Sequence, residues 1–337
     1  MNIIIPMAGM GKRMRPHTLT IPKPLISVGG KPIVQRLVED ITKVCGEKVN
    51  EIAFVIGPTF GKEVEKNLLN IASQEGAKGS IHYQEQALGT AHAIMCAESV
   101  ITGKTVVAFA DTLFKADFVM DTKNDGVIWV QRIDDPKQFG VVKLDKDGVI
   151  TDFVEKPQEF ISDLAIIGIY YFKDGDYLKK ELKYLLDNNI RDKGEFQLTN
   201  ALENMKAKGT KFTPGKVTEW LDCGNKDATV YTNQRVLEFD KGKKGMQASS
   251  AKTENSRIIE PCFIGENVMI TNSTVGPHVS LGAGTKIEKS TIKNSIIQQN
   301  AKIVSSEISN SMIGSYAELC DAKGDFSLGD YSVIKKI

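Results

Sequence analysis

The stretch Asn2–Leu25, NIIIPMAGMGKRMRPHTLTIPKPL, decides the fold of the amino-terminal part of this chain. It opens with an apolar run, Ile3–Ile5, that is typical of a short, buried parallel strand. The run leads into a loop in which Gly9 and Gly11 let the backbone approach a ligand, and Lys12–Arg15 adds positive charge without an acidic neighbour. A strand followed by such a loop predicts an anion site, and phosphate is the expected occupant.

The spacing of this loop excludes the two best-known phosphate loops. Neither G-x-x-x-x-G-K-[ST] nor G-x-G-x-x-G fits, and no helical pattern begins before Pro32. Ala8–Met14 and Pro22–Leu25 instead resemble the A-G-x-G-x-R-[ML] and P-K-P-L elements of the sugar-phosphate nucleotidylyltransferases. The resemblance implies roles for five loop residues: Ala8, Gly9 and Gly11 would bind the nucleotide, Arg13 the departing pyrophosphate and Lys23 the attacking phosphate.

Length and composition limit the classes of protein that the chain can be. Its 337 residues predict about two domains, and 43 basic against 42 acidic side chains argue against a nucleic-acid-binding surface. Five scattered cysteines without a C-x-x-C pair predict neither a disulfide framework nor a zinc site. No signal peptide opens the chain, and no apolar run reaches the ~18 residues of a membrane span. We therefore expect a cytoplasmic protein with small-molecule partners, and neither nucleic acid nor membrane among them.

Strand and helix patterns alternate through the first half of the chain. Such alternation predicts a parallel α/β sheet of Rossmann-like type, covered on both faces, with ligands beyond the carboxyl ends of the strands. The predicted segments are helices at 32–44, 61–72 and 89–100 and strands at 3–7, 51–56, 80–83 and 104–110. A strand-rich insertion at 126–172 and helices at 176–187, 195–208 and 226–239 follow.

The last part of the chain has a different period. From Ile258 to Leu319, aliphatic residues recur every five or six positions, often followed by Gly, as in Ile264-Gly265. This repeat predicts a left-handed β-helix of the hexapeptide type, with three short strands in each coil. The polar tract at 241–252 reads as a linker, so the expected domains are 1–240, catalytic, and 253–337, the β-helix. Flat coil ends lead us to expect a homo-oligomer formed through the β-helix.

Two carboxylates are candidate ligands for Mg²⁺, which commonly takes one or two carboxylates together with substrate phosphate oxygens. Asp111 follows the predicted strand at 104–110, and its surroundings resemble the family's G-D-N-L-F motif. Asp222 lies in a segment that resembles the W-x-D-x-G element. The resemblance implies that Asp111 and Asp222 together hold one metal ion.

The base and the sugar have their own candidate segments. Gln84–Ala91 resembles the Q-x(4)-G-T-A element that reads uracil or thymine, which implies base binding by Gln84, Gly89 and Thr90, while His92 is interpreted as structural. Three further segments resemble the family's Y-G-V-V, E-K-P and G-E-x-[QE]-[LI]-T elements. They imply sugar-phosphate contacts by Gly140, Glu155, Lys156 and Glu195, with Lys156 also clamping the attacking phosphate.

Together these motifs imply a sugar-1-phosphate nucleotidylyltransferase, with dTTP and glucose-1-phosphate as the first expectation. The first loop is one residue shorter than A-G-G-x-G-T-R-L, and Ile166–Gly168 replaces the N-A-G of many relatives, so base and sugar stay open. UTP or another triphosphate is one alternative. Others are a bifunctional enzyme whose β-helix also transfers an acyl group with His278 as base, a non-catalytic regulator, and a cytidylyltransferase for a non-sugar phosphate.

Overall fold

The structure is a computed structural model that describes residues 1–9 and 11–335. These residues pack into two compact units. The first comprises Met1–Gly9 with Gln35–Trp220, and the second comprises residues 11–34 with 221–335. The predicted division into a domain at 1–240, a linker and a domain at 253–337 stays a prediction, because the two units are defined by packing and not by independent folding.

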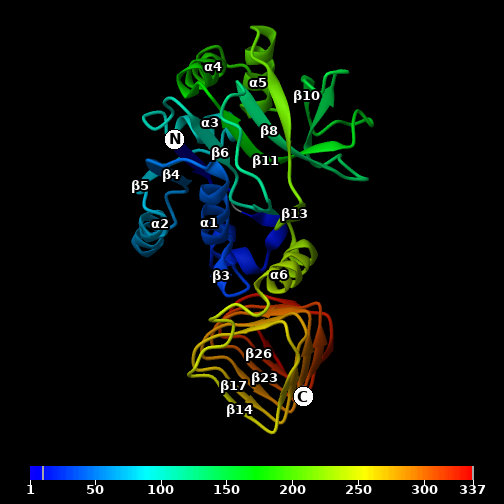
Figure 1. Cartoon of the computed structure of the whole chain (residues 1–337). Coiled ribbons are helices and arrows are strands. Elements are labelled where there is room, and N and C mark those ends of the chain that lie inside the picture. The colour runs from blue at the N-terminus through cyan, green and yellow to red at the C-terminus, as the bar shows by residue number, and fades with distance from the viewer. Residues whose placement is uncertain (10, 336–337) are drawn as a thin grey trace. The chain divides into compact units, whose positions relative to one another are not determined.

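The first unit is built on one mixed sheet with the order β10-β9-β11-β6-β1-β4-β5, to which β8 and β12 are added beside β11. The strands β6, β1, β4 and β5 are parallel, as predicted, whereas β11 runs antiparallel to β6. Figure 1 shows this sheet with its helices. Its strands are β1 (Asn2–Pro6), β4 (Glu51–Ile56), β5 (Lys78–Tyr83), β6 (Thr105–Ala108), β8 (Gly126–Arg132), β9 (Gly140–Leu144), β10 (Ile150–Glu155), β11 (Leu164–Phe172) and β12 (Phe212–Lys216).

Helices cover the sheet because successive strand residues point to opposite faces and both sets are apolar. Ile4 packs in one core cluster with residues of α3, α4 and α5, whereas Ile3 and Ile5, on the other face, are equally buried. The α-helices of this unit are α1 (Ile33–Cys45, from Gln35 onward), α2 (Lys62–Gln74), α3 (Thr90–Met95), α4 (Gly175–Asp187) and α5 (Leu198–Ala207). The short strand β7 (Thr112–Lys115) follows β6.

Two predicted helices are shorter than their sequence patterns. The helix expected at 89–100 ends at Met95 and continues as turns, and the helix expected at 195–208 begins only at Leu198. The second difference has a clear cause. Glu195 exchanges backbone hydrogen bonds with Asp192 in a tight turn, and Phe196 donates its N–H to Leu88 O, so this backbone has non-helical partners and cannot begin the helix.

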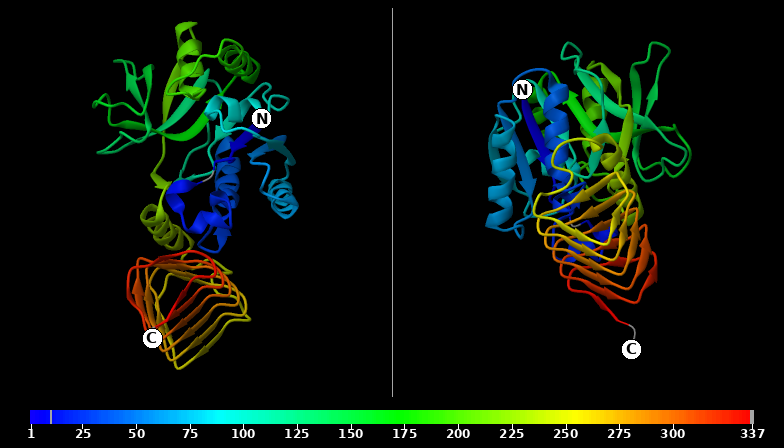
Figure 2. Two further views of the ribbon diagram at one scale, coloured as in Figure 1. Left: turned by 180° about the vertical axis from the view of Figure 1, so that it is seen from behind. Right: turned by 60° about the horizontal axis from the view of Figure 1, so that its bottom comes forward.

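The second unit contains stacked parallel strands in three sheets, consistent with the predicted left-handed β-helix. One coil brings the chain from Lys252 to its neighbour Met269, and the next brings it to Lys286. Figure 2 shows the stacked coils, coloured from yellow to red. The first sheet holds β14 (Lys252–Glu254), β17 (Met269–Thr271), β20 (Lys286–Glu288), β23 (Lys302–Val304), β26 (Glu318–Cys320) and β29 (Val333–Ile334). The second holds β15 (Arg257–Ile258), β18 (Thr274–Val275), β21 (Thr291–Lys293), β24 (Glu307–Ser309) and β27 (Lys323–Gly324). The third holds β16 (Cys262–Ile264), β19 (Val279–Leu281), β22 (Ser295–Ile297), β25 (Met312–Ile313) and β28 (Ser327–Leu328).

The third sheet of the β-helix is covered on its outer face by α6 (Lys226–Asp240) and by residues 11–34. Those residues form the short turns η1 (Lys12–Met14), η2 (His17–Leu19) and η3 (Lys23–Leu25) and the strands β2 (Ser27–Val28) and β3 (Lys31–Pro32). Burial follows from the cover, since β19 and β22 are buried at every position whereas β20 is exposed at both of its flanking positions.

Asn233 of α6 joins these three parts of the second unit. It is fully buried, and its Oδ1 accepts hydrogen bonds from Gly29 N at 2.9 Å and from Ser280 Oγ at 2.7 Å. Its Nδ2 donates to His278 O at 3.4 Å. Beyond this network, the His17 ring nitrogen Nε2 lies 3.1 Å from Ser327 Oγ in the last coils.

None of the helices in residues 1–9 and 11–335 combines the length and apolar character needed to cross a membrane.

Candidate active site

The segment predicted to read the base is a compact loop between β5 and α3. Gln84 follows β5, and its backbone N–H donates to Ile56 O at 2.9 Å, which continues the sheet. Its amide Nε2 lies 3.2 Å from Gly89 O and 3.1 Å from His92 Nδ1. The structure therefore brings Gln84 and Gly89 together and adds His92, which the sequence analysis interpreted as structural.

Position 89 accepts only glycine, because of its backbone conformation and its close contact with another segment. Its φ is 114°, and a Cβ placed there would lie 2.5 Å from Phe196 O and 2.7 Å from Phe196 N. Two backbone hydrogen bonds of 2.9 Å hold the segments together on either side of Gly89. Phe196 N donates to Leu88 O, and Ala91 N donates to Phe196 O. The base segment is thus held against the segment that carries Glu195.

Side chains extend this connection between the two segments. The Thr90 hydroxyl donates to Gln197 Oε1 at 3.2 Å and accepts from Leu198 N at 2.8 Å, and Gln197 Nε2 donates to Glu195 Oε2 at 3.0 Å. The hydroxyl of Thr90 is therefore engaged within the protein, and Gln197 orients the Glu195 carboxylate. Gln197 was not nominated from sequence, although it occupies the [QE] position of the motif that located Glu195.

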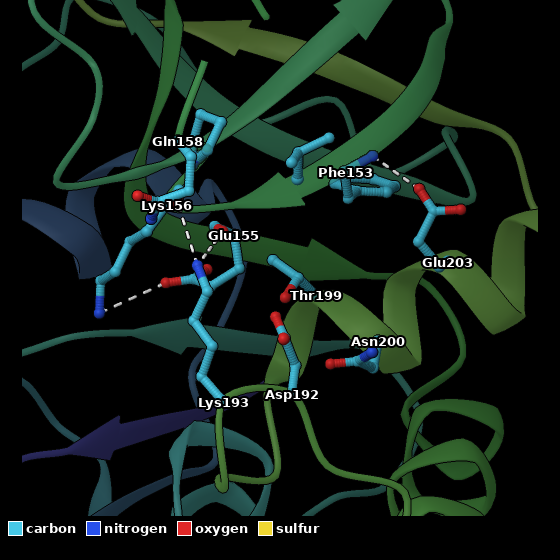
Figure 3. A pocket seen from close by; sticks show the side chains of 11 residues that line it. Phe153, Glu155, Lys156, Gln158, Asp192, Lys193, Thr199, Asn200 and Glu203 are labelled. Carbon is cyan, nitrogen blue, oxygen red and sulfur yellow. Dashed lines mark hydrogen bonds and ion pairs between the residues drawn. The ribbon is translucent and has the colours of Figure 1, made fainter. Parts of the chain in front are cut away.

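A pocket of about 340 Å³ lies beside the sugar-side candidates Glu155 and Lys156 (Figure 3). The two residues end β10 and begin the following turn, where Lys156 has a φ of 43°. Lys193 supports that turn, since its Nζ donates to Glu155 O at 3.1 Å and to Lys156 O at 3.0 Å. Gly140 pairs with Glu155 across β9 and β10, and a Cβ on it would lie 3.1 Å from Glu155 Oε2.

Charge in this pocket is arranged around Glu155. Burial raises the pKa of the Glu155 carboxyl above its ordinary value, and the Lys156 ammonium, 3.6 Å from Oε1, opposes that rise. Lys156 itself is about half exposed, so its ammonium can turn toward a bound anion. The pocket thus offers one partly buried carboxylate and one accessible cation, which suits a polar ligand that carries a phosphate.

The pocket wall also contains residues that sequence reasoning did not select. Asp192, Thr199, Asn200 and Glu203 line it, and Figure 3 shows the first three close together below Glu155. Asn200 Oδ1 is buried without a hydrogen-bond partner among the described residues, whereas Glu203 Oε1 accepts from Phe153 N at 2.6 Å. Of these four residues, only Thr199 belongs to one of the motifs found in the sequence, the segment 194–199 that also contains Glu195.

Asp111 lies between β6 and β7, as predicted, although β6 ends at Ala108 and not at residue 110, so Asp111 is three residues beyond its carboxyl end. The turn around it is fixed by Phe109 N, which donates to Gly168 O at 2.9 Å, and by Thr112 Oγ1, which donates to Ile167 O at 2.6 Å. The segment 166–168, which replaces the N-A-G of many relatives, therefore supports the Asp111 turn through its backbone.

The phosphate-loop candidates are divided between the two units. Ala8 and Gly9 follow β1 in the first unit, and, apart from the chain neighbours of Gly9, no described residue has an atom within 4 Å of a Cβ built on it. Gly11, Arg13 and Lys23 belong to the second unit. Gly11 has a φ of 56°, and a Cβ on it would lie 3.0 Å from Lys23 Cβ, so glycine is needed both for the turn and for the packing of Lys23.

Asp222 ends the strand β13 (Glu219–Asp222), and its main-chain oxygen accepts from Thr232 Oγ1 of α6 at 2.9 Å. A Cβ on Gly224 would lie 2.7 Å from Asp222 Oδ2, so the glycine of the W-x-D-x-G element leaves room for the carboxylate. No group of three or more His, Cys, Asp or Glu suited to a metal occurs among residues 1–9 and 11–335. An Asp carboxylate is a suitable ligand for Mg²⁺, which commonly takes one or two carboxylates and completes its coordination with water and substrate phosphates.

Comparison with known proteins identifies the family. The model of the family described as "Nucleotidyl transferase" matches residues 2–238. The chain belongs to the nucleotidyl transferase family. With its relatives it is a sugar-1-phosphate nucleotidylyltransferase, and enzymes of this family generally use a divalent metal ion.

Three relatives illustrate the range of similarity. The chain is 31% identical to the low-salt glycan biosynthesis nucleotidyltransferase Agl11 of Haloferax volcanii, over 93% of this chain and 92% of that protein. It is 28% identical to the glucose-1-phosphate thymidylyltransferase of Streptomyces antibioticus, over 99% of each chain. It is 29% identical to the bifunctional protein GlmU of Methanococcus vannielii, over 94% of this chain and 78% of that one.

A solved structure supports the fold. The putative glucose-1-phosphate thymidylyltransferase of Bacillus anthracis, crystallised with a sucrose, matches with a TM-score of 0.60 at 25% identity. The match covers 72% of this chain and 97% of that one. The names of two of these relatives and of this structure describe nucleotidyl transfer, and glucose-1-phosphate is the one sugar phosphate that they name.

Proposed function

We propose that this chain transfers a thymidylyl group from dTTP to glucose-1-phosphate and releases pyrophosphate. The observation that carries the proposal is the hydrogen bond from Gln84 Nε2 to Gly89 O, which leaves Gln84 Oε1 to accept the N3–H of a pyrimidine imide. The similarity to a thymidylyltransferase along the whole chain supports the same choice. UTP is the second candidate, because uracil and thymine present the same hydrogen-bonding edge.

The sugar phosphate is proposed to bind at the pocket beside Glu155. Glu155 lines this pocket, and its carboxylate would accept hydrogen bonds from sugar hydroxyls together with that of Glu195. The absence of a side chain at Gly140, which pairs with Glu155, would let the sugar approach β9. The Lys156 ammonium would contact the sugar's phosphate. Gln197 supports this arrangement, since it holds Glu195 by a 3.0 Å hydrogen bond.

The triphosphate is proposed to bind along the first loop, at Ala8, Gly9 and Gly11. Asp111 and Asp222 are the proposed carboxylate ligands of Mg²⁺, which when bound would neutralise phosphate charge. Arg13 would stabilise the negative charge that develops on the departing pyrophosphate.

In the proposed reaction, a phosphate oxygen of glucose-1-phosphate attacks the α-phosphorus of dTTP in line. The new O–P bond forms as the bond to the β-phosphate oxygen breaks, and pyrophosphate leaves with that electron pair. No protein nucleophile takes part, so the residues act by positioning and by charge. Lys23 and Lys156 would hold the attacking phosphate against the charge of the triphosphate.

The test is pyrophosphate release by the full-length protein with Mg²⁺. Each of dTTP, UTP, CTP, ATP and GTP is paired with glucose-1-phosphate, N-acetylglucosamine-1-phosphate and mannose-1-phosphate, and an EDTA control removes the metal. We expect the highest kcat/KM for dTTP with glucose-1-phosphate. A preference for a purine triphosphate would overturn the proposal, and activity only with UTP would transfer it to the second candidate.

The bifunctional alternative is tested in the same preparation. His278, the residue considered as acyl-transfer base, has its Nε2 2.6 Å from Glu238 Oε1 of α6. Release of free coenzyme A from acetyl-coenzyme A and glucosamine-1-phosphate would establish a second activity. We expect no release of coenzyme A.

A further inference from the structure

Gly89 O determines which terminal atom of the Gln84 amide is the nitrogen. The terminal amide atom that faces Gly89 O lies 3.2 Å from it. A carbonyl oxygen can only accept, so this atom must be the NH₂ group. The same atom lies 3.1 Å from His92 Nδ1, and its second hydrogen points to that ring nitrogen.

His92 must therefore accept through Nδ1. The ring is then neutral and carries its proton on Nε2, because a proton on Nδ1 would set two donors against each other at 3.1 Å. The surroundings of His92 also favour the neutral ring. Burial lowers the pKa of His92 below its ordinary value, and the Arg191 guanidinium lowers it further. Arg191 lies in the loop after α4, where its guanidinium stacks over Phe196.

With both amide hydrogens occupied, Gln84 presents only its Oε1 to a ligand. An isolated acceptor pairs with the N3–H of thymine or uracil and is repelled by cytosine, whose N3 carries a lone pair. Gln84 follows β5 and is half-buried, and Oε1 is the amide atom left for a ligand. Gly89 O orients the amide, and the His92 ring occupies the second hydrogen of the NH₂ group, which would otherwise be free to donate to a base.

We propose that His92 is a positioning residue that fixes the Gln84 amide as a hydrogen-bond acceptor and so selects imide bases over cytosine. The proposal rests on the proposed function, because it assumes that Gln84 contacts the base. His92 touches neither the nucleotide nor the reacting atoms. It acts through Gln84 alone and should affect the affinity for the triphosphate and not the chemical step.

Two matched variants test this role. His92→Asn keeps an acceptor, since Asn Oδ1 stands two bonds from Cβ as Nδ1 does, whereas His92→Leu keeps the bulk and removes the acceptor. For His92→Leu we expect KM for dTTP to rise about tenfold with kcat within about twofold, and the dTTP-to-CTP ratio of kcat/KM to fall about tenfold. His92→Asn should restore both to within about threefold of the wild type. An unchanged ratio in His92→Leu, or no restoration by Asn, would overturn the proposal.

A second measurement separates this inference from the proposed function. Long-range ¹H–¹⁵N spectra of the full-length protein report the tautomer of each of its four histidines, and the His92→Asn spectrum assigns the signal of His92. We expect the Nε2–H tautomer at pH 7.5. A proton on Nδ1 would overturn the inference whatever the substrate is, whereas purine preference with an Nε2–H ring would reject only the proposed function and the base selection that depends on it.

Discussion

His17 should make the stability of the second unit depend on pH. Its side chain is only 4% exposed, with Nε2 3.1 Å from Ser327 Oγ. Burial lowers the pKa of His17 from 6.5 to about 4, and of the nearby charges Asp330 raises it while Lys226 lowers it. Below pH 6.5 the unfolded chain therefore binds a proton that the folded chain does not. The stability contributed by neutral His17 is present above pH 6.5 and declines as the pH falls to 4.

The size of this effect follows from the difference in pKa. A shift from 6.5 to about 4 corresponds to about 3 kcal/mol in full, and about 2 kcal/mol of it should be lost between pH 7 and pH 5. The control is His17→Gln, because its amide can still reach Ser327 but does not titrate. All other groups are common to both proteins, so the difference between their pH profiles isolates His17.

Hydrogen exchange of backbone amides is the suitable assay. Both tryptophans of the chain, Trp129 and Trp220, lie in the first unit, so their fluorescence would report on the wrong unit. Amides near His17 are protected by defined bonds, such as Ser315 N to Asp330 Oδ1 at 2.7 Å. Their opening free energy should fall about 2 kcal/mol further in the wild type than in His17→Gln between pH 7 and pH 5. Parallel pH profiles for the wild type and His17→Gln would show that His17 does not make the stability of the second unit depend on pH.

Three substitutions and one truncation give further predictions. Asp111→Asn should lower the rate of pyrophosphate release by more than tenfold without changing the circular dichroism spectrum, and a smaller loss would remove Asp111 from the metal role. Gln84→Ala should weaken dTTP and UTP together in KM, and selective loss of one would contradict shared recognition. Asn233→Ala should destabilise the second unit by about 3 kcal/mol, because it leaves two buried donors without their acceptor; a change below about 1 kcal/mol in urea denaturation would count against that network. Cutting the chain within 241–245 should give an insoluble or inactive fragment, since α6 and residues 11–34 would lose the sheet they cover; a soluble, active fragment that is smaller in light scattering would instead support the separate catalytic domain and β-helix assembly expected from sequence.

Much of the fold could be predicted because its signals are local. The apolar face at 33–45 and the continuous apolar run at 52–56 produced α1 and β4 close to their expected bounds. The repeat that begins near Ile258 needed no tertiary information, since each coil buries the same aliphatic position against its neighbour. Motif order along the chain likewise indicated the family without any geometry.

Boundaries set by distant partners were not readable from sequence. The start of α5 at Leu198 depends on hydrogen bonds from residues 195–196 to Asp192 and Leu88, and the latter lies in another part of the chain. The packing of residues 11–34 on the β-helix depends on single contacts, such as Gly30 against Phe263, where a Cβ would lie 2.3 Å from the ring. No window of sequence contains both members of such a pair.

The sequence alone indicated the motifs that carry the candidate site residues and the order of those motifs, because both are fixed along the covalent chain. It identified Gln84 and Gly89 as a pair, and it identified Glu195 by its neighbours. Only the tertiary structure decided what those groups present to a ligand. The NH₂ group of Gln84 lies against the His92 ring of α3 and against Gly89 O. Such hydrogen bonds exist only when the whole fold has brought donor and acceptor to about 3 Å.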